Sequence, residues 1–351
     1  MADSARHWHL ARRPAGLPVP TDFSLGEVPL PPLSPGQVEL DLHWLSVDPY
    51  MRTRMQPEGY GYLAKWGPGT PLSAWGLGRI LRSRGRWREG DWVVGHLPVA
   101  DRARLTVPEP QALLPLCLPG ETPSPERWLH ARGMTGFTAW LGIRHYGRPR
   151  SGETLLVSAA AGAVGSLAVQ FAQREGARVI GSAGSGAKRD WLKETLGVDT
   201  VLDDRDTEGF ADALATAAPE GIDMDFENLG GPVFEAAIEG LRPGGRVVLC
   251  GLVSQYHDPE PRRAPPNLAR LPAIGARLMP FVVPGHEAEH WTRFQAEMAD
   301  LELVAPFDVV GGLDAWPQAF CGLFTGKGIG KRVVRVVGTN SSSLLPLTSS
   351  G

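Results

Sequence analysis

Cysteine is scarce in this chain, with only Cys117, Cys250 and Cys321 among 351 residues. Three thiols so far apart form neither a disulfide framework nor a four-cysteine zinc site, which predicts a reducing compartment, the cytoplasm. The N-terminal residues contain no apolar leader segment, and no hydrophobic run reaches membrane-spanning length. We therefore expect neither export nor membrane insertion.

The chain also lacks an excess of charge of either sign. Its 35 Lys and Arg residues nearly balance 38 Asp and Glu residues, for a formal net charge of −3. This balance argues against nucleic acid or an anionic membrane as the main partner and leaves a small molecule as the expected one. The length favours two domains, and 42% hydrophobic residues suffice for sizeable cores.

The sequence pattern of the first third of the chain differs from the pattern that begins at about residue 150. In the first third, short and partly alternating runs such as residues 38–42 and 91–94 are bounded by Pro and Gly, which is typical of β structure. From about residue 150, expected strands at 153–158, 177–182, 200–202, 222–227 and 245–250 alternate with helical patterns such as 166–175 and 188–196. Alternating strands and helices predict βαβ units and a doubly wound parallel sheet.

A glycine turn follows the first of these strands. The spacing Ala160-x-Gly162-x-x-Gly165 differs from the dinucleotide-binding pattern G-x-G-x-x-G only in its first position. Gly162 would let backbone amides approach a pyrophosphate, and Gly165 would allow close packing of the helix that follows. The alternative is a tight turn in an unrelated α/β fold.

The acid that usually follows this turn is missing. An NAD site expects Asp or Glu about 20 residues on, at the end of the second strand. Here that strand ends in Gly181-Ser182, and Lys188 follows on a loop of small residues. A lysine would pair with a 2′-phosphate, which indicates NADP(H), although Lys188 could also be an exposed lysine in a first helical turn.

Several strings resemble the zinc-independent medium-chain dehydrogenases/reductases. They are Val47-Asp-Pro-Tyr-Met-Arg52, Gly133-Met-Thr-Gly-Phe-Thr-Ala139, Ala159-Ala-Ala-Gly-Ala-Val-Gly-Ser166, Phe226-Glu-Asn-Leu-Gly-Gly231, Cys250-Gly-Leu-Val-Ser-Gln-Tyr256 and Gly330-Lys-Arg-Val-Val334. Within that family the chain is similar, over about residues 8–338, to the prostaglandin reductase and 2-alkenal (double-bond) reductase branch. That branch includes plant double-bond reductases and bacterial curcumin-reductase-like enzymes.

This resemblance implies an α/β fold in which a Rossmann domain is inserted into a GroES-like, β-rich substrate domain. The expected boundaries are 1–127 for the substrate domain, 128–310 for the NADP-binding domain and 311–338 for the return to the substrate domain. Residues 339–351 read as a disordered tail. Dimers are common in this family, so the resemblance also suggests a homodimer.

The resemblance also implies a set of cofactor contacts. The pyrophosphate would lie on Gly162, Ala163, Val164 and Gly165, and the 2′-phosphate on Lys188. The dinucleotide would be lined by Asn228, Cys250, Gly251, Leu252, Val253, Ser254, Gln255 and Tyr256. Phe281, Val282 and Val283 would lie along the nicotinamide half, with Met134 and Thr138 nearby.

Three features depart from the family. Asp203 and Asp204 stand near the end of the third Rossmann strand, where a tyrosine usually contacts the 2′-phosphate. Gly328 replaces an asparagine, which predicts the loss of one hydrogen bond to the cofactor. Residues 68–105 are shorter than usual and lack a glycine-rich turn at 72–76, so the wall of the substrate pocket is not predicted.

The expected chemistry is conjugate reduction without a metal. Zinc alcohol dehydrogenases of this superfamily need an early Cys and a Gly-His-Glu string, and this chain has neither. Hydride addition to the β-carbon of an enone creates an enolate oxygen that requires a hydrogen-bond donor. Tyr256 is the first candidate and Tyr50 the second, and either could instead only pack against cofactor or substrate.

Other motifs give weaker signals. His286-Glu-Ala-Glu-His290 matches two zinc-hydrolase patterns, but it directly follows Pro284 and Gly285 and has no third ligand, so we expect no metal there. Ser185-x-x-Lys188 suits phosphate binding better than acylation, and residues 326–331 fail the P-loop spacing. Residues 257–266 could form a mobile lid or a loop stiffened by proline.

The sequence therefore predicts an NADPH-dependent reductase of α,β-unsaturated ketones or aldehydes. An NADPH:quinone oxidoreductase is the first alternative, because zinc-free relatives share fold and cofactor. The second is a non-catalytic NADPH-binding protein, which the acids at Asp203 and Asp204 and the glycine at Gly328 suggest.

Overall fold

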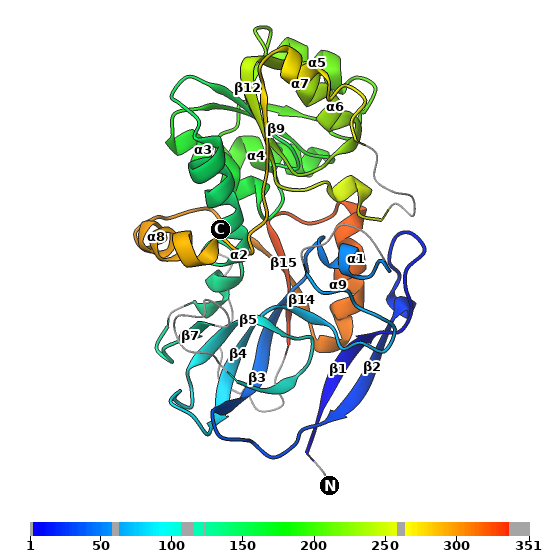
Figure 1. Cartoon of the computed structure of the whole chain (residues 1–351), viewed down its shortest axis with the longest axis vertical. Coiled ribbons are helices and arrows are strands. Elements are labelled where there is room, and N and C mark those ends of the chain that lie inside the picture. The colour runs from blue at the N-terminus through cyan, green and yellow to red at the C-terminus, as the bar shows by residue number, and fades with distance from the viewer. Residues whose placement is uncertain (1–2, 58–62, 107–115, 123, 258–263, 337–351) are drawn as a thin grey trace.

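The computed structural model describes residues 3–57, 63–106, 116–122, 124–257 and 264–336, arranged in two domains stacked along the long axis (Figure 1). The sequence-based expectation of an α/β fold with a β-rich second domain is confirmed. The tail expected at 339–351 lies outside the described residues. Within the described ranges, no helix combines the length and the hydropathy that a membrane span requires.

The β-rich domain is built on a seven-stranded sheet in the order β14-β15-β3-β4-β5-β7, with β6 also paired to β3 and a separate β1-β2 ribbon, and we call it the substrate domain after the role that the resemblance predicts. Its strands are β1 (Ser4–Leu10), β2 (Phe23–Pro29), β3 (Gln37–Ser46), β4 (Ser73–Ser83), β5 (Trp92–Pro98), β6 (Arg102–Thr106), β7 (Leu116–Leu118), β14 (Phe307–Gly311) and β15 (Lys331–Arg335). Its helical segments are η1 (Pro20–Asp22), α1 (Met51–Arg54), η2 (Pro125–Leu129), η5 (Leu313–Ala315), α9 (Trp316–Gly322) and η6 (Leu323–Thr325).

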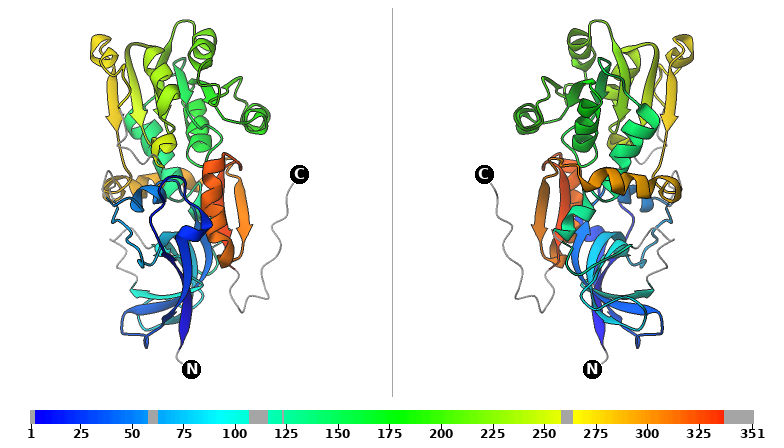
Figure 2. Two further views of the ribbon diagram at one scale, coloured as in Figure 1. Left: turned by 90° about the vertical axis from the view of Figure 1, so that its right-hand side faces the viewer. Right: turned by 90° about the vertical axis from the view of Figure 1, so that its left-hand side faces the viewer.

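The return of the chain to this sheet is clear in both views of Figure 2, where the orange and red segment lies against the blue and cyan strands. Strand β15 pairs with β3 and places Val333 opposite Ser46. Strand β14 pairs in parallel with β15. The boundary expected between residues 310 and 311 falls within β14.

The second domain contains an all-parallel sheet in the order β10-β9-β8-β11-β12-β13, and we call it the nucleotide domain after the role that the resemblance predicts. Its strands are β8 (Thr154–Val157), β9 (Arg178–Ser182), β10 (Thr200–Leu202), β11 (Ile222–Glu227), β12 (Leu241–Leu249) and β13 (Arg277–Pro280). Its helical segments are α2 (Met134–Trp140), η3 (Leu141–Gly147), α3 (Gly165–Arg174), α4 (Gly186–Leu196), α5 (Phe210–Ala217), α6 (Gly231–Glu239), η4 (Val253–Gln255), α7 (Arg270–Ala273) and α8 (Glu287–Ala299).

Strand β8 is buried on both faces, as strands of a doubly wound sheet are. Leu155 and Val157 belong to the core shared with α2, α3 and α8, whereas Leu156 belongs to the core under α5 and α6. In chain order β8 comes first, so the order of the strands reverses between β8 and β11. Dinucleotides bind at such a switch point, outside the carboxyl ends of the strands.

Candidate active site

A cavity of about 540 Å³ lies between the two domains, at the carboxyl ends of β8 and β11. Most of the side chains and turns expected at the site line it. These are Tyr50, Met134, Thr138, Gly162, Ala163, Val164, Gly165, Lys188, Asn228, Cys250, Gly251, Val253, Tyr256, Phe281, Val282 and Val283. Three expected residues are not among those lining it: Gln255, which lies in η4, and Leu252 and Ser254, which pack beside Gly230.

The glycine turn has the tight geometry that its sequence predicts. A Cβ on Gly165 would lie 2.4 Å from the carbonyl oxygen of Ala159 and 2.9 Å from the Cα of Ala160, so no side chain fits there. Gly162 donates its N–H to the Ala159 carbonyl at 3.0 Å, and Ala159 itself has a left-handed φ of 49°. The turn leads directly into α3, whose first N–H groups carry partial positive charge. This cradle fits a pyrophosphate.

Two contacts that the sequence did not predict hold this turn in place. The Nε2 of His130 lies 3.0 Å from the Ala163 carbonyl oxygen. Because a carbonyl only accepts, Nε2 carries the proton, and burial lowers the pKa of His130 to about 4. From the other domain, Gly330 donates its N–H to the carbonyl of Ala161 at 2.9 Å. The turn is therefore fixed by both domains.

Lys188 lies at one end of the cavity, near the two acids that depart from the family. Burial lowers its pKa, and the nearby carboxylate of Asp204 opposes this shift. Asp203 pairs with Arg189 at 2.8 Å, and Asp204 accepts a hydrogen bond from the Ser182 hydroxyl at 3.2 Å. Both acids thus have polar partners, and Lys188 remains the basic group of α4 that lines the cavity.

Gly328 also lines this end of the cavity, with a left-handed φ of 92°. A Cβ at this position would lie 2.2 Å from Oδ2 of Asp308, which pairs with Arg332 at 2.6 Å. The ion pair occupies the space of a side chain at residue 328. An asparagine would fit only if this pair moved.

Asn228 is held at the end of β11 by two hydrogen bonds to Ser158, from its backbone N–H to the hydroxyl at 2.7 Å and from Nδ2 to the carbonyl at 2.8 Å. Beneath it, Glu227 accepts the N–H groups of Leu229 and Gly230. Glu227 and Asp225 are fully buried, and burial raises the pKa of both carboxyls, that of Glu227 to about 7.

Tyr256 follows η4 and brings its hydroxyl over the end of β12. The hydroxyl oxygen lies 3.0 Å from where a Cβ of Gly251 would be, and it accepts the Leu252 N–H at 3.4 Å. Its own carbonyl accepts the amide of Gln56 at 3.4 Å, which links this segment to the substrate domain. Cys250 directly precedes Gly251, and burial raises the pKa of its thiol to about 12, so this free cysteine stays neutral.

The substrate domain supplies a wall that the sequence did not predict. Leu63, Trp75 and His96 line it together with Tyr50. Trp75 and His96 face each other across β4 and β5 and meet edge to face, with ring centroids 5.8 Å apart. Each comes from a different strand, and neither strand carries a motif, so no local signal in the sequence marks them.

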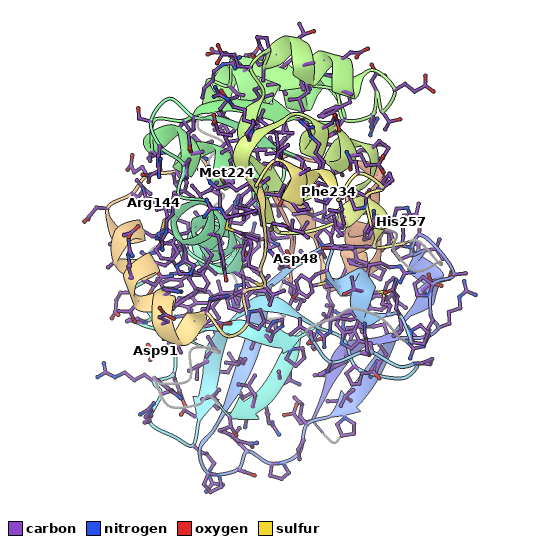
Figure 3. All side chains as sticks on the ribbon, turned by 45° about the horizontal axis from the view of Figure 1, so that its top comes forward. Asp48, Asp91, Arg144, Met224, Phe234 and His257 are labelled. Carbon is purple, nitrogen blue, oxygen red and sulfur yellow. The ribbon has the colours of Figure 1, made fainter. Side chains whose placement is uncertain are left out.

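A buried ion pair completes this wall. Asp48 lies where the two domains meet (Figure 3) and accepts hydrogen bonds from Nζ of Lys331 and from the hydroxyl of Ser46. The side chains of Lys331 and Asp48 are only 1% and 6% exposed. Both residues stand in strings that carry the family resemblance, but their pairing joins β15 to the segment after β3 and could not be read from either string.

The histidines of the His286–His290 string lie at the start of α8, as the preceding Pro284 and Gly285 predict. Tyr146 stacks on Phe281 and its hydroxyl lies 2.9 Å from Nε2 of His286. In the part of the chain that the structure describes, no group of three or more His, Cys, Asp or Glu could hold a metal ion.

The expected lid falls largely on residues 258–263, which lie outside the described ranges.

Comparisons with known proteins match both domains. Residues 6–113 match the family described as "N-terminal domain of oxidoreductase", and residues 163–287 match "Zinc-binding dehydrogenase". The chain is 37% identical to the NADPH-dependent curcumin reductase of Escherichia coli, over 95% of this chain and 97% of that protein. It is 34% identical to the NADP(+)-dependent 2-alkenal reductase of Nicotiana tabacum, over 84% of this chain and 85% of that one.

A solved structure is similar over the same extent. The CurA protein of Vibrio vulnificus in complex with NADPH superimposes with a TM-score of 0.88 at 34% sequence identity, covering 95% of this chain and 99% of that chain.

Proposed function

This chain belongs to the zinc-independent medium-chain dehydrogenase/reductase family, in the branch of the prostaglandin and 2-alkenal reductases, and from that premise we propose that it uses NADPH to reduce the C=C bond of α,β-unsaturated ketones or aldehydes. One observation carries the proposal. A glycine turn, the half-buried Lys188 and two tyrosines from different domains, Tyr50 and Tyr256, all line one largely apolar cavity.

The residues present fit this cofactor. Gly165 has no room for a side chain, so α3 begins close against the turn, and Gly162 has no side chain to keep a pyrophosphate from the backbone N–H groups. Lys188 would pair with the 2′-phosphate, and Asn228, Cys250, Gly251 and Val253 would contact the dinucleotide. Met134, Thr138 and residues 281–283 would pack along its nicotinamide half. Bound NADPH supplies the hydride that the β-carbon of the substrate accepts.

The protein's own part in the reaction is to hold the substrate and to stabilise its oxygen. Tyr256 would donate its hydroxyl proton in a hydrogen bond to the enolate oxygen, because its oxygen is already positioned by the Leu252 N–H. Tyr50 enters from the opposite domain and is the second candidate for returning a proton to the α-carbon. Leu63, Met134 and Trp291 would exclude water from the reacting atoms.

Substrate consumption tests the proposal directly. We expect the purified chain to oxidise NADPH in the presence of a 2-alkenal or an arylidene ketone, with and without a chelator, and to ignore simple quinones. Reduction of quinones alone would replace it by the quinone oxidoreductase alternative. Saturable NADPH binding without turnover on any of these compounds would favour a non-catalytic binding protein.

Tyr256→Phe tests the assignment of the proton donor. Loss of one donor to a developing oxyanion lowers kcat about 100-fold, and we expect a loss of this order with enones at unchanged affinity for NADPH. Tyr146→Phe is the matched control, because Tyr146 contacts Phe281 from outside the cavity. An unchanged kcat in Tyr256→Phe would leave this tyrosine with a packing role only.

The remaining expectations are that the substrate is a small molecule, that the protein acts in the cytoplasm and that it forms a homodimer. Sedimentation of the purified chain tests the last of these.

A further inference from the structure

His96 differs from every other residue of β5 in the exposure of its side chain. The remaining residues of this strand are buried or half-buried, whereas the His96 side chain is accessible because it faces the cavity. Val94 and Leu97, which flank the Gly95–His96 pair, are fully buried and hold the strand in place. The imidazole is therefore presented to the cavity from a rigid part of the sheet.

No hydrogen bond joins the His96 ring to another residue in the ranges that the structure describes. Its contact with Trp75 is edge to face and leaves polar atoms unused. The two charged groups near it are committed elsewhere. Asp48 accepts from Lys331 and Ser46, and Arg54 donates to the Ala64 carbonyl at 2.9 Å and the Ser73 hydroxyl at 3.0 Å.

The ring is neutral at pH 7. Burial lowers the pKa of His96, the positive charge of Arg54 lowers it further, and Asp48 only partly opposes them. A neutral imidazole offers one N–H donor and one nitrogen acceptor. A hydroxyl group, which both donates and accepts, complements this pair, whereas the neighbouring Leu63, Trp75 and Met134 offer apolar contact.

We propose that His96 is a specificity-determining residue that hydrogen-bonds a hydroxyl group of the substrate, so that hydroxyl-bearing enones and enals are preferred over those without one. This inference rests on the proposed function. It adds a polar contact on the substrate-domain wall, across the cavity from the residues assigned to the cofactor. A bound substrate without the hydroxyl would cover the His96 nitrogens and leave them unpaired, and this cost would supply the discrimination.

Two probes that differ in one hydroxyl test the inference: benzylideneacetone and 4-hydroxybenzylideneacetone. We expect kcat/KM of the wild-type chain to be about tenfold higher for the hydroxylated probe, mainly through KM. His96→Phe keeps a ring against Trp75 but removes both nitrogens, so the ratio should fall to about one. His96→Gln keeps a donor and an acceptor and should retain most of the preference.

His9→Gln is the matched control, because His9 lies on β1 and outside the residues lining the cavity, and it should leave the ratio unchanged. A wild-type ratio of about one, or the same preference in His96→Phe as in the wild type, would overturn the inference. If His96→Phe does not fold, the wild-type ratio together with that of His96→Gln decides in the same way.

A failure of the proposed function is distinguishable from a failure of this inference. If the wild type consumes NADPH with neither probe, the proposed function is wrong. The affinity of the protein for each of the two probes, measured by the quenching of tryptophan fluorescence, then tests His96 alone. A tighter Kd for the hydroxylated probe that His96→Phe abolishes supports the contact, and equal Kd values overturn it.

Discussion

The two walls of the cavity are built from different parts of the polypeptide. The part of the nucleotide-domain wall that we assign to the cofactor phosphates includes a glycine turn, a helix N-terminus and the ends of β11 and β12, with Lys188 as its basic side chain, and we call it the main-chain wall. The wall from the substrate domain includes the side chains of Tyr50, Trp75 and His96 together with the Asp48–Lys331 pair, and we call it the side-chain wall. A main-chain wall binds a group that is always the same, and a side-chain wall can be varied without changing the fold.

Adding a side chain to the main-chain wall should have the largest effect on cofactor binding. In Gly165→Val the new side chain would meet the Ala159 carbonyl, because even a Cβ lies 2.4 Å from it. We expect the Kd for NADPH to rise about 100-fold or more, which corresponds to about 2.7 kcal/mol. Isothermal titration measures it. Gly186→Ala is the control, since nothing lies within 4 Å of a Cβ there, and normal binding by Gly165→Val would contradict a main-chain contact.

Removing one charge from the side-chain wall should have the largest effect on the stability of the fold. Lys331→Met leaves the buried Asp48 carboxylate unpaired, which costs about 3–5 kcal/mol. Urea unfolding of the purified variant measures the loss. The double variant Asp48→Asn with Lys331→Met should recover most of it, because no buried charge then lacks a partner. Equal stability of the single and double variants would show that the pair is not coupled.

Lys188→Ala tests the basic side chain of the main-chain wall. We expect KM to rise about tenfold for NADPH and little for NADH, because only the former carries the 2′-phosphate. Steady-state kinetics with both cofactors gives the comparison. Lys193→Ala, on the exposed face of the same helix, is the matched control. Equal effects on both cofactors would remove Lys188 from the phosphate site.

The smallest effect is expected beneath the main-chain wall, at the buried carboxyls of Asp225 and Glu227. Burial raises both pKa values in the folded protein, that of Glu227 from 4.5 to about 7, so the folded chain holds these protons more tightly than the unfolded chain. The stabilisation is therefore full below about pH 4.5 and is lost as the pH rises through about 7.

Asp225→Asn removes one of these proton-binding groups. The loss of unfolding free energy between pH 5 and pH 8 should then be smaller than in the wild type by about 1 kcal/mol. Denaturant melts at both pH values measure this difference, with Asp223→Asn, on the same strand but half-buried, as control. A variant that loses as much stability as the wild type over this range would place the titration elsewhere.

The same contrast explains what could be predicted from the sequence. The glycine turn and Lys188 lie within 30 residues of one another, in the continuous segment from β8 through α3 and β9 to α4, and their spacing alone carries the chemistry. The parallel sheet could be predicted because the alternation of strand and helix patterns is also a local signal. The fold family of the first domain came from short strings such as that around Tyr50, not from its irregular strands.

The side-chain wall could not be predicted, because its members meet only through pairing of distant strands. His96 and Trp75 are neighbours by the β4–β5 register, and Asp48 and Lys331 by the return of β15. The contact of His130 with the Ala163 carbonyl could not be predicted either, because the two residues are distant in the chain and no motif around His130 indicates it. In the sequence, Asp203 and Asp204 are departures from the family pattern, and only their partners Arg189 and Ser182 account for them.

The pairing of Val333 with Ser46 has a consequence for biosynthesis. While the ribosome makes the chain from its N-terminus, residues 44–46 of β3 lack their partner strand until β15 emerges, after the entire nucleotide domain. An unpaired strand edge of this kind is a site for wrong association between nascent chains. The substrate domain therefore finishes folding last although it is started first, and truncations that stop short of β15 should aggregate rather than yield a stable first domain.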